Sequence, residues 1–81
     1  MSTVTLVGRE GCHLCEDARA VVTSVLNEFP AIELVEVSID DDEVLHEQYW
    51  EQIPVVLING KVHNFWRIDP ERLRQKLSMV E

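Results

Sequence analysis

The spacing of apolar and polar residues predicts how the chain begins. Residues 3–7 are rich in β-forming side chains and stop at Gly8, which predicts a first strand. From Leu14 onwards apolar residues recur every three or four positions, so a helix is expected over residues 12–29, ended by Pro30. The expected apolar stripe of this helix is Leu14, Ala18, Val21, Val22, Val25, Leu26 and Phe29.

A second strand is predicted over residues 32–39, a stretch dense in Val, Ile and Leu. Its apolar phase shifts at Leu34 and Val35, so either both faces of the strand are buried or the strand carries a bulge. The acidic run 40–43 then supplies caps and first-turn acids for a short helix over residues 44–49.

A hairpin is predicted next. The run Val55–Ile58 is wholly apolar, as expected of a short buried strand. Asn59 and Gly60 form the strongest short-range hairpin signal, so residues 61–66 should return antiparallel as an edge strand.

The last predicted element is an amphipathic helix. Asp69 and Pro70 pair an N-cap residue with proline at the first helical position. Leu73, Leu77 and Val80 then form its apolar side.

The predicted order is therefore β-α-β-α-β-β-α, an α/β fold. Two strands joined by a helix should be parallel with a right-handed crossover, and the hairpin adds two strands of mixed direction. The sequence thus predicts a four-stranded mixed sheet with helices on both faces. With 81 residues the chain is too short for two independent cores, so residues 1–81 are expected to form a single domain.

Composition narrows the classes of partner. A hydrophobic fraction of 46% with 27% charged residues is ordinary for a folded chain. The net charge of -8, from 15 acidic against 7 basic residues, argues against nucleic acid or an anionic membrane. The longest apolar run, Val55–Ile58, is far below the roughly 20 residues that span a bilayer. The N-terminus has no features of a secretory signal, so a cytoplasmic location is expected.

Both cysteines, Cys12 and Cys15, fall at the predicted turn between the first strand and the first helix. Residues three apart on a helix rise about 4.5 Å and share nearly one face, which suits the roughly 4.4–6.8 Å Cα separation of a disulfide. So short a loop removes little unfolded-state entropy, so stability is not the purpose of such a bridge. The pair is interpreted as a redox-active disulfide that opens and closes in place.

The two positions predict different roles. Cys12 stands at the helix start, where unpaired N–H groups favour a thiolate, so it is expected to attack as the nucleophile. Cys15 is one turn further in and should be more buried, as the resolving cysteine. Arg9 is a candidate to support the thiolate, while nearby acids oppose it. His13 either adds positive charge beside Cys12 or is an exposed spacer.

A metal site is the competing interpretation. Structural zinc needs four ligands, and two cysteines with the scattered His13, His46 and His63 give no familiar spacing. No metal is therefore expected within one chain. An iron–sulfur cluster bridging two chains stays open as an alternative.

The segment Gly11-Cys12-His13-Leu14-Cys15, the Ile53-Pro54 pair before a strand and the Asn59-Gly60 hairpin resemble the glutaredoxin-like branch of the thioredoxin fold. The likeness covers nearly the whole chain and is nearest to small glutaredoxin-like proteins with a Cys-His-Leu-Cys motif. It implies a thioredoxin-like βαβαββα fold and a thiol–disulfide oxidoreductase. It also implies that the proline is cis and lies against the cysteines, and that the preceding residue pairs its backbone with substrate. The expected substrate-contacting residues are Ile53, Pro54, His13, Leu14 and Arg9.

Some residues depart from the glutaredoxin pattern. His13 and Leu14 replace the usual Pro and Tyr between the cysteines. Asn64 and Phe65 stand where glutaredoxins have a Gly-Gly pair that admits glutathione. Both changes remove expected glutathione contacts. No cofactor is expected, and glutathione or another low-molecular-weight thiol is a candidate co-substrate.

Phe65, Trp66 and Arg67 allow two interpretations. The aromatic pair either forms a docking surface near the cysteines or caps the sheet and packs on the last helix. The expected enzyme is a monomer that acts on a disulfide-containing protein or small thiol and takes electrons from a reductase or a low-molecular-weight thiol. The alternative is a non-catalytic binding module that carries an iron–sulfur cluster across a dimer or docks a partner protein.

Overall fold

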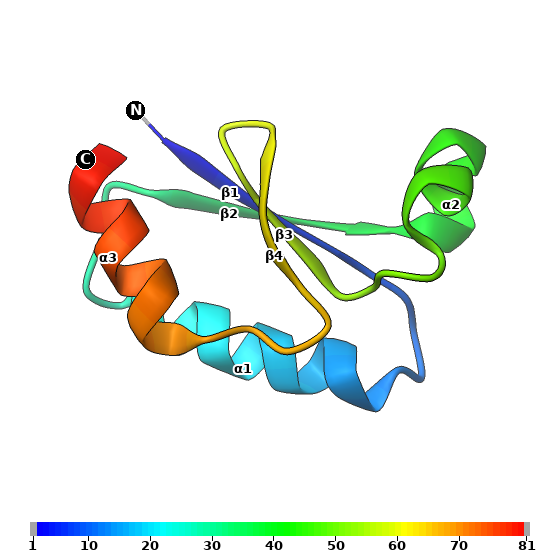
Figure 1. Ribbon diagram of the computed structural model, residues 1–81, viewed down its shortest axis with the longest axis horizontal. Helices are drawn as coiled ribbons and strands as arrows, with labels where there is room; N and C mark the ends of the chain where they lie inside the picture. The colour runs from blue at the N-terminus through cyan, green and yellow to red at the C-terminus, as the bar shows by residue number, and fades with distance from the viewer. Residues whose placement is uncertain (1, 81) are drawn as a thin grey trace.

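The computed structural model describes residues 2–80, and its elements follow the predicted order (Figure 1). A short 3₁₀ helix, Ile39–Asp41, which the sequence pattern did not predict, follows the second strand. The strands and α-helices are β1 (Thr3–Gly8), α1 (His13–Leu26), β2 (Glu33–Ser38), α2 (Glu43–Tyr49), β3 (Val55–Ile58), β4 (Lys61–Phe65) and α3 (Pro70–Val80).

The four strands form one mixed sheet in the order β2-β1-β3-β4. β1 pairs in parallel with β2 and antiparallel with β3, and β3 pairs antiparallel with β4. The parallel first pair and the edge position of β4 are as predicted. The two central strands, β1 and β3, are the most buried because they have neighbours on both sides.

Apolar clusters cover the two faces of the sheet. On one face α1 and α3 lie side by side against the sheet, and Val22, Leu73 and Leu77 are fully buried there with Val4 and Val56. On the other face α2 covers one end of the sheet (Figure 1). There the buried residues are Val7, Ile39 and Val55, with Leu45 and Tyr49 packed on them. The prediction of helices on both faces is confirmed.

The first helix is shorter than predicted. Instead of residues 12–29 it covers His13–Leu26, with Cys12 as its N-cap. At its end Glu28 and Phe29 donate their backbone N–H groups three residues back, which tightens the chain into a turn. Pro30 disfavours helical geometry at the residue before it, so the helix ends early although Phe29 continues the apolar spacing.

The change in apolar spacing at Leu34 and Val35 arises because both faces of strand β2 are half-buried, and the strand has no bulge there. β2 covers Glu33–Ser38, shorter than the predicted 32–39, and its register with β1 is uninterrupted. Leu34 packs against the cluster under α1 and α3, whereas Val37 packs against the cluster under α2.

The predicted helix caps are present. The Asp42 carboxylate accepts from the backbone N–H groups of Val44 and Leu45 at the start of α2. The Asp69 carboxylate accepts from Glu71 and Arg72 at the start of α3. Val80, predicted on the apolar side of α3, is 36% exposed at the last position of the helix.

Strand β4 is shorter and less regular than predicted. It ends at Phe65 instead of residue 66, and its register with β3 shifts between Val56 and Leu57. Trp66 has φ 64°, in the left-handed region, so it cannot continue the ladder. The edge strand therefore ends in a sharp change of direction.

Candidate functional site: the cysteine pair and the Ile53–Pro54 loop

The first cysteine caps helix α1. Cys12 has an extended backbone, and its Sγ accepts the backbone N–H of Cys15 at 3.2 Å. A sulfur thus occupies the place that a Ser or Asp oxygen takes at most helix starts. Cys12 is partly exposed, and both cysteines are free thiols. The sulfur of Cys12 therefore lies at the N-terminal end of α1 and accepts one of its free backbone N–H groups.

The second cysteine is buried against strand β1. Cys15 is 8% exposed, as predicted from its place one turn into the helix. A Cβ added at Gly8 would lie 3.0 Å from Cys15 Sγ and 3.2 Å from Cys15 Cβ. Gly8 therefore allows the helix to start against the end of the strand. The sequence analysis treated Gly8 only as the end of a strand and missed this contact.

Burial makes Cys15 a weak acid. Desolvation, together with smaller contributions from the neighbouring Cys12, raises its pKa to about 11. A backbone hydrogen bond from Arg9 and the charge of Arg19 act in the opposite direction without cancelling it. Cys15 is therefore a protonated thiol at neutral pH.

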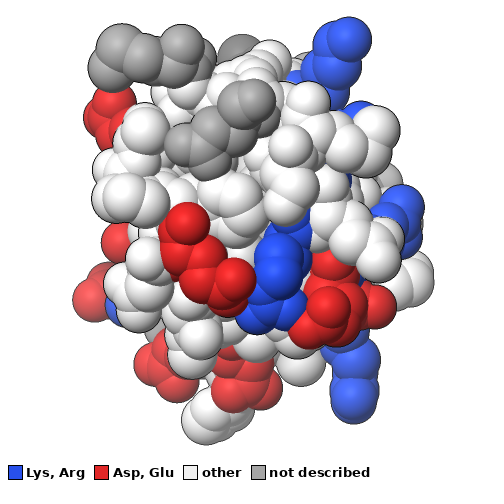
Figure 2. Space-filling model, turned by 90° about the vertical axis from the view of Figure 1, so that its left-hand side faces the viewer, with Lys and Arg blue, Asp and Glu red and all other residues white. Residues whose placement is uncertain are grey.

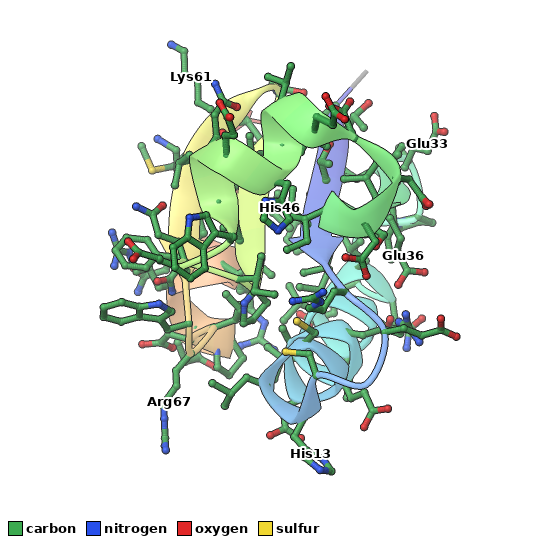
Figure 3. All side chains as sticks on the ribbon, turned by 90° about the vertical axis from the view of Figure 1, so that its right-hand side faces the viewer. His13, Glu33, Glu36, His46, Lys61 and Arg67 are labelled. Atoms are coloured by element: carbon green, nitrogen blue, oxygen red, sulfur yellow. The ribbon has the colours of Figure 1, made fainter. Side chains whose placement is uncertain are left out.

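The charged residues near the pair are engaged elsewhere or face solvent. The Arg9 guanidinium donates to Asp40 at 2.9 Å, which ties it to the 3₁₀ helix. The His13 side chain is 98% exposed, and its nearest acid is Glu16, with Nδ1 to Oε2 at 3.9 Å. In Figure 3 it extends away from the molecule. This placement agrees with the exposed-spacer interpretation of His13.

The loop before β3 has the cis peptide that the family resemblance implied, between Ile53 and Pro54. Pro54 is fully buried. The Ile53 backbone N–H donates to Tyr49 O at 3.0 Å, at the end of α2. The expected pairing of the Ile53 backbone with substrate would therefore use its carbonyl, or would require the N–H to leave Tyr49.

Trp66 ties the end of β4 to this same loop. Its backbone N–H donates to Pro54 O at 2.9 Å, and its indole N–H donates to Glu51 O at 2.9 Å. Its ring also meets Phe65 edge-on, with centroids 5.0 Å apart. The indole hydrogen bond thus reaches Glu51, in the loop after α2, and both rings stay partly exposed.

Exposed apolar side chains lie beside the start of α1. Leu14, Phe65 and Trp66 are 41%, 39% and 54% exposed, and with Arg67 they line one hollow. Leu14 was predicted on the apolar stripe of the helix. It lies in the first turn of α1 and borders this hollow instead.

Two classes of feature are absent from the described residues. Within residues 2–80 no three His, Cys, Asp or Glu side chains are grouped so that they could hold a metal ion. No helix among these residues has the length and apolarity needed to cross a membrane.

The comparisons with known proteins agree with this geometry. Residues 3–78 match the family model of the glutaredoxin-like domain (DUF836). The chain belongs to this glutaredoxin-like family. A glutaredoxin-like protein of Dictyostelium discoideum is 30% identical over 77 residues, which is 89% of this chain and 71% of that protein.

Solved structures show the same fold. The X-ray structure of protein XcR50 from X. campestris is 32% identical, with a TM-score of 0.76 over 94% of this chain and 96% of that one. A thioredoxin from Fasciola hepatica is 19% identical, with a TM-score of 0.72 over 99% of this chain and 81% of that one. The glutaredoxin-like chain thus has a thioredoxin-like fold, as predicted.

The contact between Gly8 and Cys15 gives a stability prediction. Gly8→Ala should lower the free energy of unfolding by about 1–3 kcal/mol, because the new Cβ overpacks against Cys15 Sγ. In a Cys15→Ala background the same change should cost clearly less, since the sulfur is gone. Urea denaturation of the four proteins measures this cycle. If Gly8→Ala lowered the free energy of unfolding equally in both backgrounds, the contact between Gly8 and the Cys15 sulfur would be contradicted.

The raised pKa of Cys15 gives a reactivity prediction. In a Cys12→Ser variant, alkylation of Cys15 by iodoacetamide should still be accelerating above pH 9.0, because burial, the largest cause of the raised pKa of Cys15, is kept in the variant. In the urea-unfolded variant the rate should instead follow the pKa of free cysteine, about 8.5. Circular dichroism at each pH checks that the folded sample stays folded. If the alkylation rate of the folded variant reached a plateau below pH 9, the raised pKa of Cys15 would be refuted.

Proposed function

We propose that this protein is a thiol–disulfide oxidoreductase in which Cys12 attacks and Cys15 resolves. The observation that carries the proposal is the hydrogen bond from the Cys15 N–H to Cys12 Sγ, 3.2 Å long, at the start of α1. It directs a backbone donor at the partly exposed sulfur of Cys12, while burial raises the pKa of Cys15 behind it. The glutaredoxin-like family membership and the thioredoxin-like fold support the same chemistry.

The reaction has two exchange steps. The Cys12 thiolate attacks one sulfur of a substrate disulfide, forms a mixed disulfide and releases the other substrate sulfur as a thiolate. Cys15 then gives up its proton, which the released thiolate can accept, and attacks Cys12 Sγ. The Cys12–Cys15 disulfide forms and the second substrate sulfur leaves. The substrate gains two electrons, and an external dithiol or thiol must reduce the enzyme again.

The substrate surface we propose is the hollow of Leu14, Phe65, Trp66 and Arg67. These side chains are exposed although three of them are apolar, and Leu14 lies in the same helical turn as the cysteines. Exposed apolar area of this kind favours a peptide or protein disulfide flanked by apolar residues over a small, highly polar one. The Ile53 carbonyl would align the substrate backbone.

Trapping tests the roles of the two cysteines. Cys15→Ser should accumulate a covalent mixed disulfide with a model peptide disulfide through Cys12, because the resolving thiol is gone. Cys12→Ser should form no adduct at neutral pH, because the remaining thiol is buried and protonated. Intact-mass and peptide-level mass spectrometry measure both results. If the wild-type protein exchanged with no disulfide, the proposal that it is a thiol–disulfide oxidoreductase would be refuted.

The reductant gives a second prediction. We expect glutathione to reduce the Cys12–Cys15 disulfide more slowly than a thioredoxin reductase with its electron donor does. The reason is that Asn64 and Phe65 have side chains at the two positions where glutaredoxins have glycine. Replacing both residues by glycine should raise the glutathione rate, whereas replacing both by alanine, which keeps each Cβ, should not. Stopped-flow reduction measures each rate. Equally fast reduction of the wild type by glutathione, with the reductase inactive, would overturn this expectation.

A further inference from the structure

A second hollow lies far from the cysteines, between strand β4 and helix α3. Its volume is about 570 Å³, within the range of about 300–1,000 Å³ that small-molecule sites usually have. Basic side chains line it from both elements, and we call it the basic groove, defined by Lys61, His63, Arg72 and Lys76. In Figure 3, Lys61 and His13 lie at opposite ends of the molecule.

The basic groove departs from the charge of the whole protein. The chain has a net charge of -8, yet no acidic residue of the described part lines this groove. Three of the chain's seven Lys and Arg residues gather there. Figure 2 shows the neighbouring face, with Lys and Arg along its right-hand side and most acidic side chains at the left and below. Such a concentration of positive charge attracts anions.

The cations of the basic groove lack ion-pair partners. Within residues 2–80 no acid lies within salt-bridge distance of Lys61, Arg72 or Lys76. On another face of the same helix, Arg74 is paired with both Glu28 and Glu71. Arg72 and Lys76 are four residues apart on α3, where like charges repel each other. A bound anion would offset this repulsion.

His63 adds a polar group without a partner. Its Nε2 is buried and has no hydrogen-bond partner among the described residues. Burial lowers the pKa of His63, and the charges of Arg72 and Lys76, which line the same groove, lower it further. A buried ring nitrogen without a partner is costly unless a ligand or water meets it.

The remaining surface of the groove is apolar. Val62 and Met79 line it and are 50% and 78% exposed. We propose that the basic groove binds a small organic phosphate, with the phosphate on Arg72, Lys76 and Lys61 and an apolar body on Val62 and Met79. An arginine fork matches phosphate oxygens, and a dianion suits three cations better than a single carboxylate does.

The test uses phenyl phosphate as the probe, followed by ¹⁵N–¹H NMR of the full chain at low salt. The amide chemical shifts of Lys61–His63 and of residues along α3 should change saturably as the probe is added. Those of Cys12–Cys15 should not change. Arg72→Gln and Lys76→Gln should each weaken binding roughly tenfold, the loss expected from one charged hydrogen bond. Arg74→Gln, which removes the same charge from the same helix, should leave affinity unchanged within about twofold.

Further arms separate the contributions of charge and apolar surface. Inorganic phosphate should bind more weakly than phenyl phosphate, and phenol should give no saturable shifts. Bound phenyl phosphate should raise the pKa of His63, measured from its ring protons, because the anion offsets the charges of Arg72 and Lys76. A Cys12→Ser/Cys15→Ser variant should bind as the wild type does, so this result is independent of the proposed redox function. No saturable shifts, or equal losses in the Arg74→Gln control, would overturn the proposal.

Discussion

The contact between the end of β1 and the first turn of α1 is the constraint on which the cysteine pair depends. Because Gly8 has no side chain, Cys15 Sγ can lie where a Cβ would otherwise be only 3.0 Å away. With Cys15 held there, its N–H donates to Cys12 Sγ. The same burial that fixes Cys15 also raises its pKa to about 11. One packing contact therefore makes two chemically equal thiols unequal.

The loop that faces substrate in the proposed reaction depends on a second set of contacts. Trp66 donates from both its backbone and its indole to carbonyls of this loop, at Pro54 and Glu51. Its φ of 64° would be unfavourable for an isolated tryptophan, and the hydrogen bonds hold it in place. The end of the edge strand thereby also positions the loop that carries Ile53.

Much of the fold could be predicted because its signals are local. The wholly apolar run Val55–Ile58 gave the bounds of β3, and the Asp69-Pro70 pair gave the start of α3. The end of α1 was predicted too late, since Phe29 fits the helical spacing while Pro30, which ends it, acts on the backbone before it. The cis bond at Pro54 came from the family resemblance and not from the residue pattern.

The parts of the site that escaped prediction are contacts between different elements of the fold. The indole of Trp66 reaches back 15 residues to Glu51, and no periodicity records such a pair. The contact of Gly8 with Cys15 likewise depends on how a helix crosses a strand end. A glycine that ends a strand just before a Cys-x-x-Cys helix is a usable signal for it, since bare backbone is needed where a sulfur is buried against a sheet.

The β3–β4 hairpin relates the cysteine site to the basic groove. β3 follows Pro54 at one end and reaches the Asn59-Gly60 turn beside the groove at the other. Coupling between two sites needs an element with two alternative arrangements. β3 is fixed between β1 and β4, and its Val55 and Val56 are fully buried. A strand held so firmly transmits little change, so the two sites should act independently of each other.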